Sequence, residues 1–475
     1  MNISIIKKLF KEYTGKTPEK VENLPLSGSD RMYVRMKTKE HVVLGAYNPH
    51  IKENEAYFSF TKHFKNFEIP VPEVLLISEN KLYYLVEDLG EESLYDKVVA
   101  CNGNLTNEVK ELYKKSLKYL IKMQVSAGKS FDYTNCYPVQ RFDDQAIQWD
   151  LNYFKYNFLK LTGVVFDEFL LEKDFQALKC FLLQIPMGSF MFRDFQSRNI
   201  LIKDNEPWFI DFQGGREGPK SYDVASLLYQ AKAQIPYETR KELFEFYFTE
   251  LNKVLTVDYH KLLNSFKGFA VLRTLQVLGA YGFRGFYEKK PHFIESIPYA
   301  LKNLKFLLLS GDFPIGVPHL KEIATKLTVP VPDEKSKNGL TIRISSFSYR
   351  KGIPADSSGN GGGFVFDCRG INNPGRHKEY QNLTGKDETV IDFFKQNSTI
   401  DNYLENIIKT IEPTINNYME RGFSNLSINF GCTGGQHRSV YCAENLSKYI
   451  QNNFNVNMVL WHREQGEYIE YDQKV

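Results

Sequence analysis

Short strand-like runs of apolar residues mark the first ninety positions of the chain. They lie within residues 30–48 and 71–88 and read RMYVRMKT, HVVLGAYN, VPEVLLIS and KLYYLVEDL. β-Branched and aromatic residues are frequent in them, and strand side chains alternate between the two faces of a sheet. The pattern predicts a small β-rich lobe over about residues 1–90.

From about residue 105 the apolar spacing becomes that of helices. The clearest segments are NEVKELYKKSLKYLIKMQV, IQWDLNYFKYNFLKLT and RKELFEFYFTELNKVL, at 107–125, 147–162 and 240–255. Apolar residues that recur every three or four positions form one face of a helix. We expect a helical large lobe over about residues 91–326. A β-rich lobe followed by a helical lobe resembles the layout of protein kinases.

The residue composition changes at LTVPVPDEKSKNG, residues 327–339, which is rich in prolines and charged residues and ends in a glycine. Such a stretch is typical of a linker. The next residues, LTIRISSFSY, alternate like the first strand of a new domain. We therefore predict an α+β kinase-like domain at 1–326, a linker at 327–339 and a smaller α/β domain at 340–475.

Composition narrows the class of protein without identifying it. A length of 475 residues predicts more than one domain, and 60 basic against 57 acidic residues give no case for a strongly basic nucleic-acid binder. Six scattered cysteines without a CxxC pair favour reduced thiols in a cytoplasmic protein over a disulfide framework or a zinc site. No window approaches about 18 uninterrupted apolar residues, so no membrane span is expected.

The stretch MFRDFQSRNILIKDNEPWFIDFQGG, residues 191–215, carries three polar residues at a spacing suited to phosphoryl transfer. Asp194 precedes Asn199 by five positions, and Asp211 follows twelve positions later, after an apolar run. Phosphoryl transfer needs a carboxylate that orients and deprotonates the attacking hydroxyl. It also needs oxygen ligands that hold Mg²⁺ against the nucleotide phosphates. The alternative is a polar loop with a capped strand.

This stretch resembles the aminoglycoside-phosphotransferase-like branch of the kinase superfamily. FRDFQSRNI stands at that family's H-x-D-x4-N motif, and IDFQGG stands at its I-D-F/W motif. Within the branch, RDFQSRN with IDFQ is most similar to bacterial kinases that phosphorylate the anomeric hydroxyl of N-acetylmuramate and N-acetylglucosamine. The resemblance covers about residues 1–325 and implies the use of ATP and Mg²⁺. It implies that Asp194 is the catalytic base and that Asn199 and Asp211 hold the metal.

The resemblance also implies where the nucleotide binds. Gly28, Ser29 and Arg31 stand in the phosphate loop, and Glu87 and Leu89 stand in the hinge beside the adenine.

The sequence departs from the kinase pattern at three places. Phe192 replaces the usual histidine of the catalytic loop, and Gln213, where many kinases have glycine, matches the sugar-kinase branch. The strand at 41–48 lacks the lysine that usually contacts the α- and β-phosphates. The candidates for supplying that positive charge are Arg31, Arg35 and Lys52.

Two residues of the helical lobe are candidates for binding the acceptor. Arg141 and Asp150 lie in a segment that mixes carboxylates with an aromatic ring, as a sugar site requires. We take them as candidate substrate-binding residues. The alternative is an ordinary helix face.

A second motif, GCTGGQHRSV at 431–440, reads as strand, glycine loop and helix. Such a loop points backbone N–H groups at an anion, and the helix N-terminus adds partial positive charge. Cys432 lies six positions before Arg438, which is also the spacing of a cysteine-dependent phosphatase. That alternative requires a general acid from a second loop, for which Asp367 and Asp387 are the candidates.

The second domain resembles the RapZ C-terminal domain family. The matching stretches are SSFSYRKGIPAD, VFDCRGINNPGR, LTGKDETVIDFF and GCTGGQHRSVYCAENLSKY. The resemblance implies an α/β domain that binds an amino-sugar phosphate, glucosamine-6-phosphate, and in RapZ also serves in RNA and protein contacts. It favours holding a phosphate over cleaving one. The residues implied to bind the phosphosugar are Arg350, Arg369, Asn373, Thr433, Gly434, Gly435, His437, Arg438 and Ser439.

Together these features predict an ATP- and Mg²⁺-dependent amino-sugar kinase, active in peptidoglycan recycling, with a domain that binds an amino-sugar phosphate. One alternative is a non-catalytic nucleotide-binding adapter that recruits RNA or protein. Another is a kinase for a different small alcohol, such as an aminoglycoside. A membrane partner is not expected.

Overall fold

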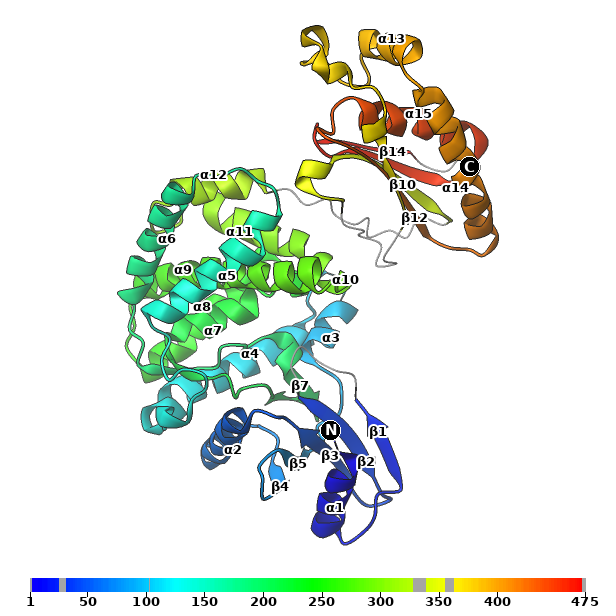
Figure 1. Ribbon diagram of the computed structural model, residues 1–475. Helices are drawn as coiled ribbons and strands as arrows, with labels where there is room; N and C mark the ends of the chain where they lie inside the picture. The colour runs from blue at the N-terminus through cyan, green and yellow to red at the C-terminus, as the bar shows by residue number, and fades with distance from the viewer. Residues whose placement is uncertain (1, 25–30, 102, 328–338, 355–362, 472–475) are drawn as a thin grey trace. The chain divides into compact units, whose positions relative to one another are not determined.

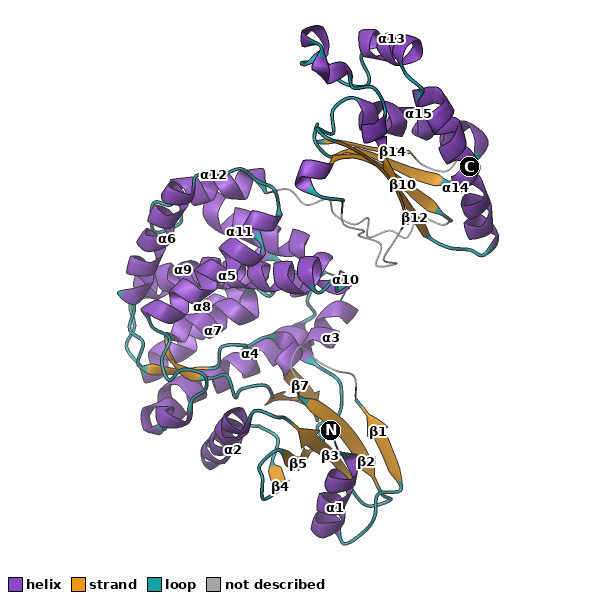
Figure 2. Ribbon diagram, viewed as in Figure 1, coloured by secondary structure: helices purple, strands orange, loops and turns teal. Residues whose placement is uncertain are grey.

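The computed structural model describes residues 2–24, 31–101, 103–327, 339–354 and 363–471 (Figure 1). The chain divides into two compact units. The first comprises Met1–Phe283 and Ser296–Val329, and the second comprises Arg284–Glu295 and Pro330–Val475. Each unit has its own sheet (Figure 2).

An antiparallel sheet and two helices open the first unit. Its elements are α1 (Ile3–Thr14), β1 (Lys20–Asn23), β2 (Met32–Lys37), β3 (Val42–Tyr47), α2 (Ile51–Asn66), β4 (Val74–Ile77) and β5 (Tyr83–Glu87). The strand order is β1-β2-β3-β5-β4. The four strand-like runs noted in the sequence are β2, β3, β4 and β5, so the prediction of a β-rich start is confirmed.

Helix α1 packs closely on this sheet because β3 has a glycine at the contact. A Cβ atom on Gly45 would lie 2.2 Å from Cγ2 of Ile6. Ile6 and Phe10 from the helix join Val34 and Leu85 from the strands in one buried cluster. The sheet beneath the expected nucleotide site is therefore held by an apolar layer on the helix side.

Helices form most of the remainder of the first unit. They are α3 (Leu94–Ala100), α4 (Asn107–Ile121), α5 (Asp144–Asn157), α6 (Glu168–Leu183), α7 (Lys220–Leu228), α8 (Tyr237–Val254), α9 (Tyr259–Tyr281), α11 (Ile297–Leu309) and α12 (Pro318–Lys326). The short helix α10 (Pro291–Ile294) is assigned to the second unit. The helices predicted at 107–125, 147–162 and 240–255 correspond to α4, α5 and α8. Helix α5 begins earlier than predicted because the side chain of Asp143 accepts the Ala146 N–H at 3.0 Å and caps it.

Helices α5 and α9 touch through their backbones. A Cβ atom on Gly279 would lie 2.7 Å from the carbonyl oxygen of Tyr153, and one on Gly282 would lie 2.0 Å from that of Asn157. No larger residue fits at either position without separating the two helices. The glycines therefore fix the distance between α5 and α9.

Two short antiparallel strand pairs hold the polar motif of residues 191–215. Strand β6 (Ser189–Met191) pairs with β9 (Arg216–Gly218), and β7 (Ile200–Lys203) pairs with β8 (Glu206–Phe209). The turn between β7 and β8 is Asp204-Asn205, and both residues have positive φ, 53° and 58°. Two such residues make the tight turn that matches strand twist. The chain therefore reverses direction within two residues, and β8 runs back along β7.

The second unit is an α/β fold. Its elements are β10 (Thr341–Ser348), β11 (Gly363–Asp367), α13 (Glu388–Asn397), α14 (Ile400–Glu420), β12 (Asn425–Cys432), α15 (Arg438–Asn453), β13 (Asn457–His462) and β14 (Glu467–Tyr471). The strand order is β11-β12-β10-β13-β14, with β14 antiparallel to β13 and the other pairings parallel. The expected order, an α+β two-lobe domain followed by a smaller α/β domain, is confirmed.

The topology of this sheet marks one edge for ligand binding. The chain leaves the central strand β10 towards β11 and β12 on one side, and later reaches β13 on the other side. Ligands of open α/β sheets bind at the carboxyl ends of the strands where the order reverses. The glycine loop follows the carboxyl end of β12, and Ser348 at the end of β10 lies in register with Cys432.

Candidate functional site

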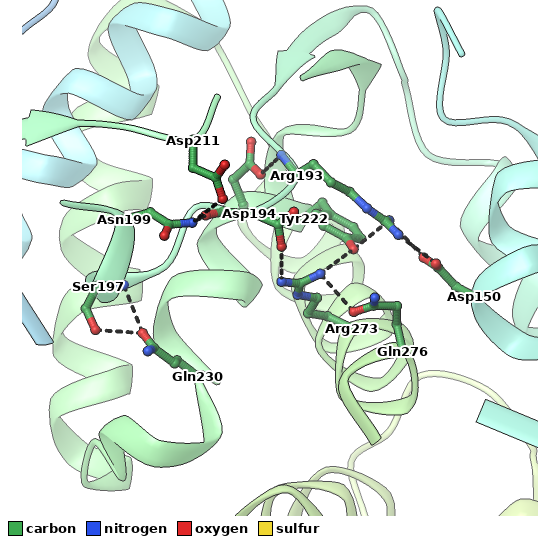
Figure 3. A network of polar contacts seen from close by, with 11 residues as sticks. Asp150, Arg193, Asp194, Ser197, Asn199, Asp211, Tyr222, Gln230, Arg273 and Gln276 are labelled. Atoms are coloured by element: carbon green, nitrogen blue, oxygen red, sulfur yellow. Dashed lines mark hydrogen bonds and ion pairs between the residues drawn. The ribbon is translucent and has the colours of Figure 1, made fainter. Parts of the chain in front are cut away.

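The β7–β8 hairpin brings Asp211 beside Asn199. The Ile210 N–H donates to the Asn199 carbonyl at 3.0 Å, directly beyond the last strand pair. The Asn199 side-chain amide donates to the backbone carbonyl of Asp194 at 2.9 Å and to Oδ2 of Asp211 at 3.4 Å (Figure 3). Nε2 of Gln213 donates to the other oxygen of Asp211 at 2.8 Å. The three motif residues therefore meet at one place.

This donor set suits a hard divalent cation. Among the described residues, no group of three or more His, Cys, Asp or Glu side chains is placed to hold a metal. Mg²⁺ commonly binds one or two protein oxygen ligands together with substrate phosphates and water. Burial and the nearby charge of Asp194 raise the pKa of Asp211. A cation held by Asn199 and Asp211 would relieve that repulsion.

Asp194 is paired with an arginine from a distant helix. Nη2 of Arg273, on α9, lies 2.6 Å from Oδ1 of Asp194 (Figure 3). Burial raises the pKa of Asp194, but the guanidinium groups of Arg273 and Arg193 outweigh it and lower that pKa to about 2. The side chain is still 41% exposed. Asp194 is therefore an accessible, ionised carboxylate at neutral pH.

The neighbouring residue, Arg193, anchors the loop. Its guanidinium donates to both oxygens of Asp150 on α5, at 2.8 and 2.6 Å, and to the hydroxyl of Tyr222 at 2.7 Å. Its backbone has φ of 78°, a conformation that costs free energy outside glycine. The predicted substrate residue Asp150 thus has both oxygens engaged by Arg193 and is buried.

A second carboxylate holds the loop backbone. Asp223 on α7 is fully buried and accepts the N–H groups of Phe192 and Arg193 at 2.7 and 2.9 Å. Burial raises the pKa of Asp223 to about 7. Phe192, in place of the usual histidine, packs against Phe195 with ring centres 5.2 Å apart. An apolar contact therefore fills the space that the histidine would occupy.

The expected nucleotide residues are placed as follows. Arg31 is buried, and its Nη2 lies 2.7 Å from Oε1 of Glu53 on α2. Glu87 ends β5 and accepts from Lys203 at 2.9 Å, and Leu89 is buried just beyond it. Gly28 and Ser29 lie outside the described residues.

Arg31 is the candidate best placed to replace the positive charge of the missing lysine. Its charge partly offsets the rise in the pKa of Asp211, so it lies within electrostatic reach of that carboxylate. Arg35 instead forms ion pairs with Asp88 and Glu91 in the hinge. Lys52 is exposed on α2.

Other residues fall outside this cluster or were missed. The side chain of Arg141 is 62% exposed and pairs with Glu217 at 2.7 Å. Arg273 and Gln230 were not selected from the sequence, although Oε1 of Gln230 accepts both the N–H and the hydroxyl of Ser197 in the catalytic loop. The only signal for Arg273 was a guanidinium in an otherwise apolar helical stretch.

In the second unit, the glycine loop wraps around Cys432. The Gly435 N–H donates to Sγ of Cys432 at 3.1 Å, and Oγ of Ser439 lies 3.2 Å from the same sulfur. The hydroxyl of Ser348 donates to the Thr433 carbonyl at 2.7 Å and accepts the Arg350 N–H at 3.2 Å. The loop is thereby tied to the end of β10.

The remaining predicted residues reach the loop from the segment after β11. Nη1 of Arg438 donates to the carbonyls of Arg369 and Ile371, both at 3.0 Å. A Cβ atom on Gly375 would lie 3.2 Å from the His437 ring, and Asn373 accepts the Gly375 N–H. Thr433 and Gly434 are exposed, whereas Gly435, His437, Arg438 and Ser439 are buried. The structure therefore gathers these residues at one edge of the sheet.

The two acids considered for the phosphatase alternative are both held as carboxylates. The bond from Arg369 lowers the pKa of Asp367, and the backbone N–H of Thr384 lowers that of Asp387. Both carboxylates are ionised at neutral pH, whereas a general acid must carry a proton. Cys432 itself is 2% exposed.

Within the described ranges, no helix is both long and apolar enough to cross a membrane.

Two family models match the chain. The model described as phosphotransferase enzyme family matches residues 20–259, which is just over half of the chain. The model described as RapZ C-terminal domain matches residues 340–466. Both resemblances expected from the sequence are confirmed.

Two curated relatives carry the name nucleotide-binding protein. The protein from Fervidobacterium nodosum is 33% identical over 172 residues, 36% of this chain and 58% of its own length. The protein from Pseudothermotoga lettingae is 33% identical over 122 residues, 26% of this chain and 42% of its own length. The chain therefore spans less than two thirds of either relative.

Solved structures of low sequence identity are also similar. A choline kinase from Cryptosporidium parvum Iowa II has a TM-score of 0.48 at 13% identity, covering 68% of this chain and 100% of its own. An amicoumacin kinase in complex with AMP-PNP, Ca²⁺ and Ami has a TM-score of 0.48 at 13% identity, covering 67% and 96%.

Proposed function

The chain belongs to the phosphotransferase enzyme family, and from this premise we propose that it is an ATP-dependent kinase of a small-molecule hydroxyl group. The observation that carries the proposal is the meeting of Asp194, Asn199 and Asp211 around the Asn199 amide. These are the groups that phosphoryl transfer requires. The β7–β8 hairpin brings Asp211 to Asn199, and Gln213 and Arg273 hold the two carboxylates.

In this proposal, Asn199 and Asp211 hold Mg²⁺, which screens the charge of the nucleotide phosphates. Asp194 accepts a hydrogen bond from the acceptor hydroxyl and aims its oxygen at the γ-phosphorus. The new O–P bond forms as the bond to the β-phosphate oxygen breaks. Because the pKa of Asp194 is about 2, the proton moves to this carboxylate only late, when the attacking oxygen has become acidic.

Arg31 supplies the charge that the third strand lacks. A kinase lysine is normally held by a glutamate of the following helix. Here Glu53 lies on α2, the helix after β3, and pairs with Arg31 from the segment before β2. An equivalent ion pair is therefore built with its cation directly before β2 instead of on β3. We assign to Arg31 the contact with the nucleotide phosphates.

We propose an amino sugar as the acceptor and its anomeric hydroxyl as the site of transfer. The motifs RDFQSRN and IDFQ support this choice. The geometry supports a positioning role for Asp150, through Arg193, rather than a direct sugar contact. We propose further that the second unit binds an amino-sugar phosphate such as glucosamine-6-phosphate at the glycine loop.

The test is phosphoryl transfer from Mg-ATP to N-acetylmuramate, N-acetylglucosamine, glucosamine and an aminoglycoside, with Asp194→Asn in parallel. NMR of the product would locate the phosphate. We expect an anomeric phosphate on an amino sugar and its loss in the variant. Transfer only to the aminoglycoside would replace the acceptor. No transfer by folded protein would favour the nucleotide-binding adapter and make RNA and protein binding the next measurement.

A further inference from the structure

A polar pocket in the first unit adjoins the catalytic loop. The loop contributes Gln196 and Arg198, α9 contributes Arg273, and the turn after α7 contributes Gln230 and Lys232. Arg273 lines the pocket and pairs with Asp194, so the pocket adjoins the ion pair of the proposed base. An acceptor that binds there and extends past Arg273 would bring its hydroxyl to Asp194.

The charges around this pocket are of one sign. Its lining includes the cations Arg198, Lys232 and Arg273 and no carboxylate. Arg273 is neutralised by Asp194, whereas in the described part of the chain Arg198 and Lys232 form no ion pair. Arg198 also lowers the pKa of Asp194, which places its charge near the base. Two cations without an ion-pair partner among the described residues therefore line a site whose other lining residues are Arg273 and neutral side chains.

The neutral side chains of the lining suit a sugar. Hydroxyl and amide groups can bond to ring hydroxyls, and aromatic rings can cover a sugar face. These side chains are Tyr95, Gln196, Ser226, Tyr229, Gln230 and Tyr281. A plain neutral sugar would leave the two cations without a partner.

We infer that the acceptor is an anionic sugar, whose carboxylate or phosphate group is bound by Arg198 and Lys232. This inference rests on the proposed kinase function and adds the acceptor's charge to it. Ionic hydrogen bonds are stronger than neutral ones, and Arg offers two parallel donors to such a group. A cationic acceptor, such as an aminoglycoside or choline, would be repelled.

Three closely matched acceptors test whether the site prefers an anionic sugar to a neutral one. N-Acetylmuramate differs from N-acetylglucosamine by a lactyl carboxylate, and N-acetylglucosamine 6-phosphate differs from it by a phosphate. We expect at least one anionic sugar to exceed the neutral sugar in kcat/KM by about 10-fold or more, the loss typical of one charged hydrogen bond. Which of the two is preferred identifies the anion. Equal kcat/KM for all three would overturn the inference while leaving the kinase intact.

Charge-removing variants then locate the contact. Arg198→Gln and Lys232→Gln should each lower, by about 10-fold, the ratio of kcat/KM for the preferred anionic sugar to kcat/KM for the neutral sugar. Lys241→Gln, an exposed lysine on α8 outside the pocket, is the matched control. If both variants instead raise KM for ATP with every acceptor, the cations serve the nucleotide and the inference is wrong.

A binding measurement separates this inference from the kinase proposal. Calorimetric titration of the three sugars into the full chain, with Mg²⁺ and a non-hydrolysable ATP analogue, requires no turnover. Selective binding of an anionic sugar that both variants abolish would support the inference even if no phosphate is transferred. Absence of binding by all three sugars would overturn it.

Discussion

The ion pair between Asp150 and Arg193 gives the sharpest test of how the catalytic loop is held. Both partners are largely buried, with side chains 7% and 15% exposed, and two hydrogen bonds of 2.6 and 2.8 Å join them. The perturbation is Asp150→Asn, which keeps the volume and one acceptor oxygen but removes the charge. Asp144→Asn is the control, since Asp144 is 61% exposed on the same helix and pairs with Lys179 at 3.0 Å.

The expected magnitude follows from burial. Removing one member of a buried ion pair typically costs about 3–5 kcal/mol, because the other charge stays buried without compensation. The remaining amide oxygen of asparagine still accepts one bond, so we expect about 3 kcal/mol at the lower end of that range. The exposed pair of Asp144 should contribute less than about 1 kcal/mol.

The assay must report on the first unit alone, because a two-unit chain does not unfold as one transition. The chain has three tryptophans, of which Trp149 and Trp208 lie in the first unit and Trp461 lies in the second. Urea unfolding followed by tryptophan fluorescence in a Trp461→Phe background would give the required free energy. Acceptor KM would be measured on the same proteins.

Two results would refute the reasoning. Equal destabilisation by Asp150→Asn and Asp144→Asn would show that the buried pair does not hold the loop. A raised acceptor KM in Asp150→Asn without loss of stability would show that Asp150 contacts the substrate directly, as the sequence first indicated.

Three further outcomes follow from the same geometry. Arg31→Met should raise KM for ATP about tenfold or more while Arg31→Lys largely preserves it, and steady-state kinetics showing no change in KM would remove Arg31 from the nucleotide site. Burial raises the pKa of Asp223 from 3.8 to about 7, so native stability should fall as pH rises through that interval. Asp223→Asn cannot ionise and should flatten the fall, and an unchanged slope in urea titrations would contradict this. Gly435→Ala, with φ of 68° and a Cβ atom 2.4 Å from Cγ of Glu464, should destabilise the second unit by about 1–3 kcal/mol and abolish binding of glucosamine-6-phosphate. Gly434→Ala, with open space around it, should leave stability within about 0.5 kcal/mol, and equal effects in calorimetry would refute the steric argument.

The sequence predicted the parts of the site that are close in the chain. Asn199 and Asp211 are twelve positions apart and joined by a hairpin whose turn residues are local, so their meeting follows from spacing. The glycine loop between β12 and α15 is local in the same sense.

The sequence could not predict partners that only the tertiary fold supplies. Arg273 reaches Asp194 across 79 positions, and Asp150 reaches Arg193 across 43. Nothing in a single sequence says which buried arginine meets which carboxylate. The position of Arg438 shows the same limit, since its carbonyl partner Arg369 lies 69 positions away.

The backbone contact between α5 and α9 has a consequence for the chemistry of Asp194. Helix α5 carries Asp150, which holds Arg193, and α9 carries Arg273. The positions of both cations that keep Asp194 ionised therefore depend on two helices that touch at Gly279 and Gly282. A methyl group added at Gly279 or Gly282 would separate the two helices and move Arg193 and Arg273 away from Asp194. The low pKa of Asp194 therefore depends on the distance between α5 and α9, which is set outside the catalytic loop.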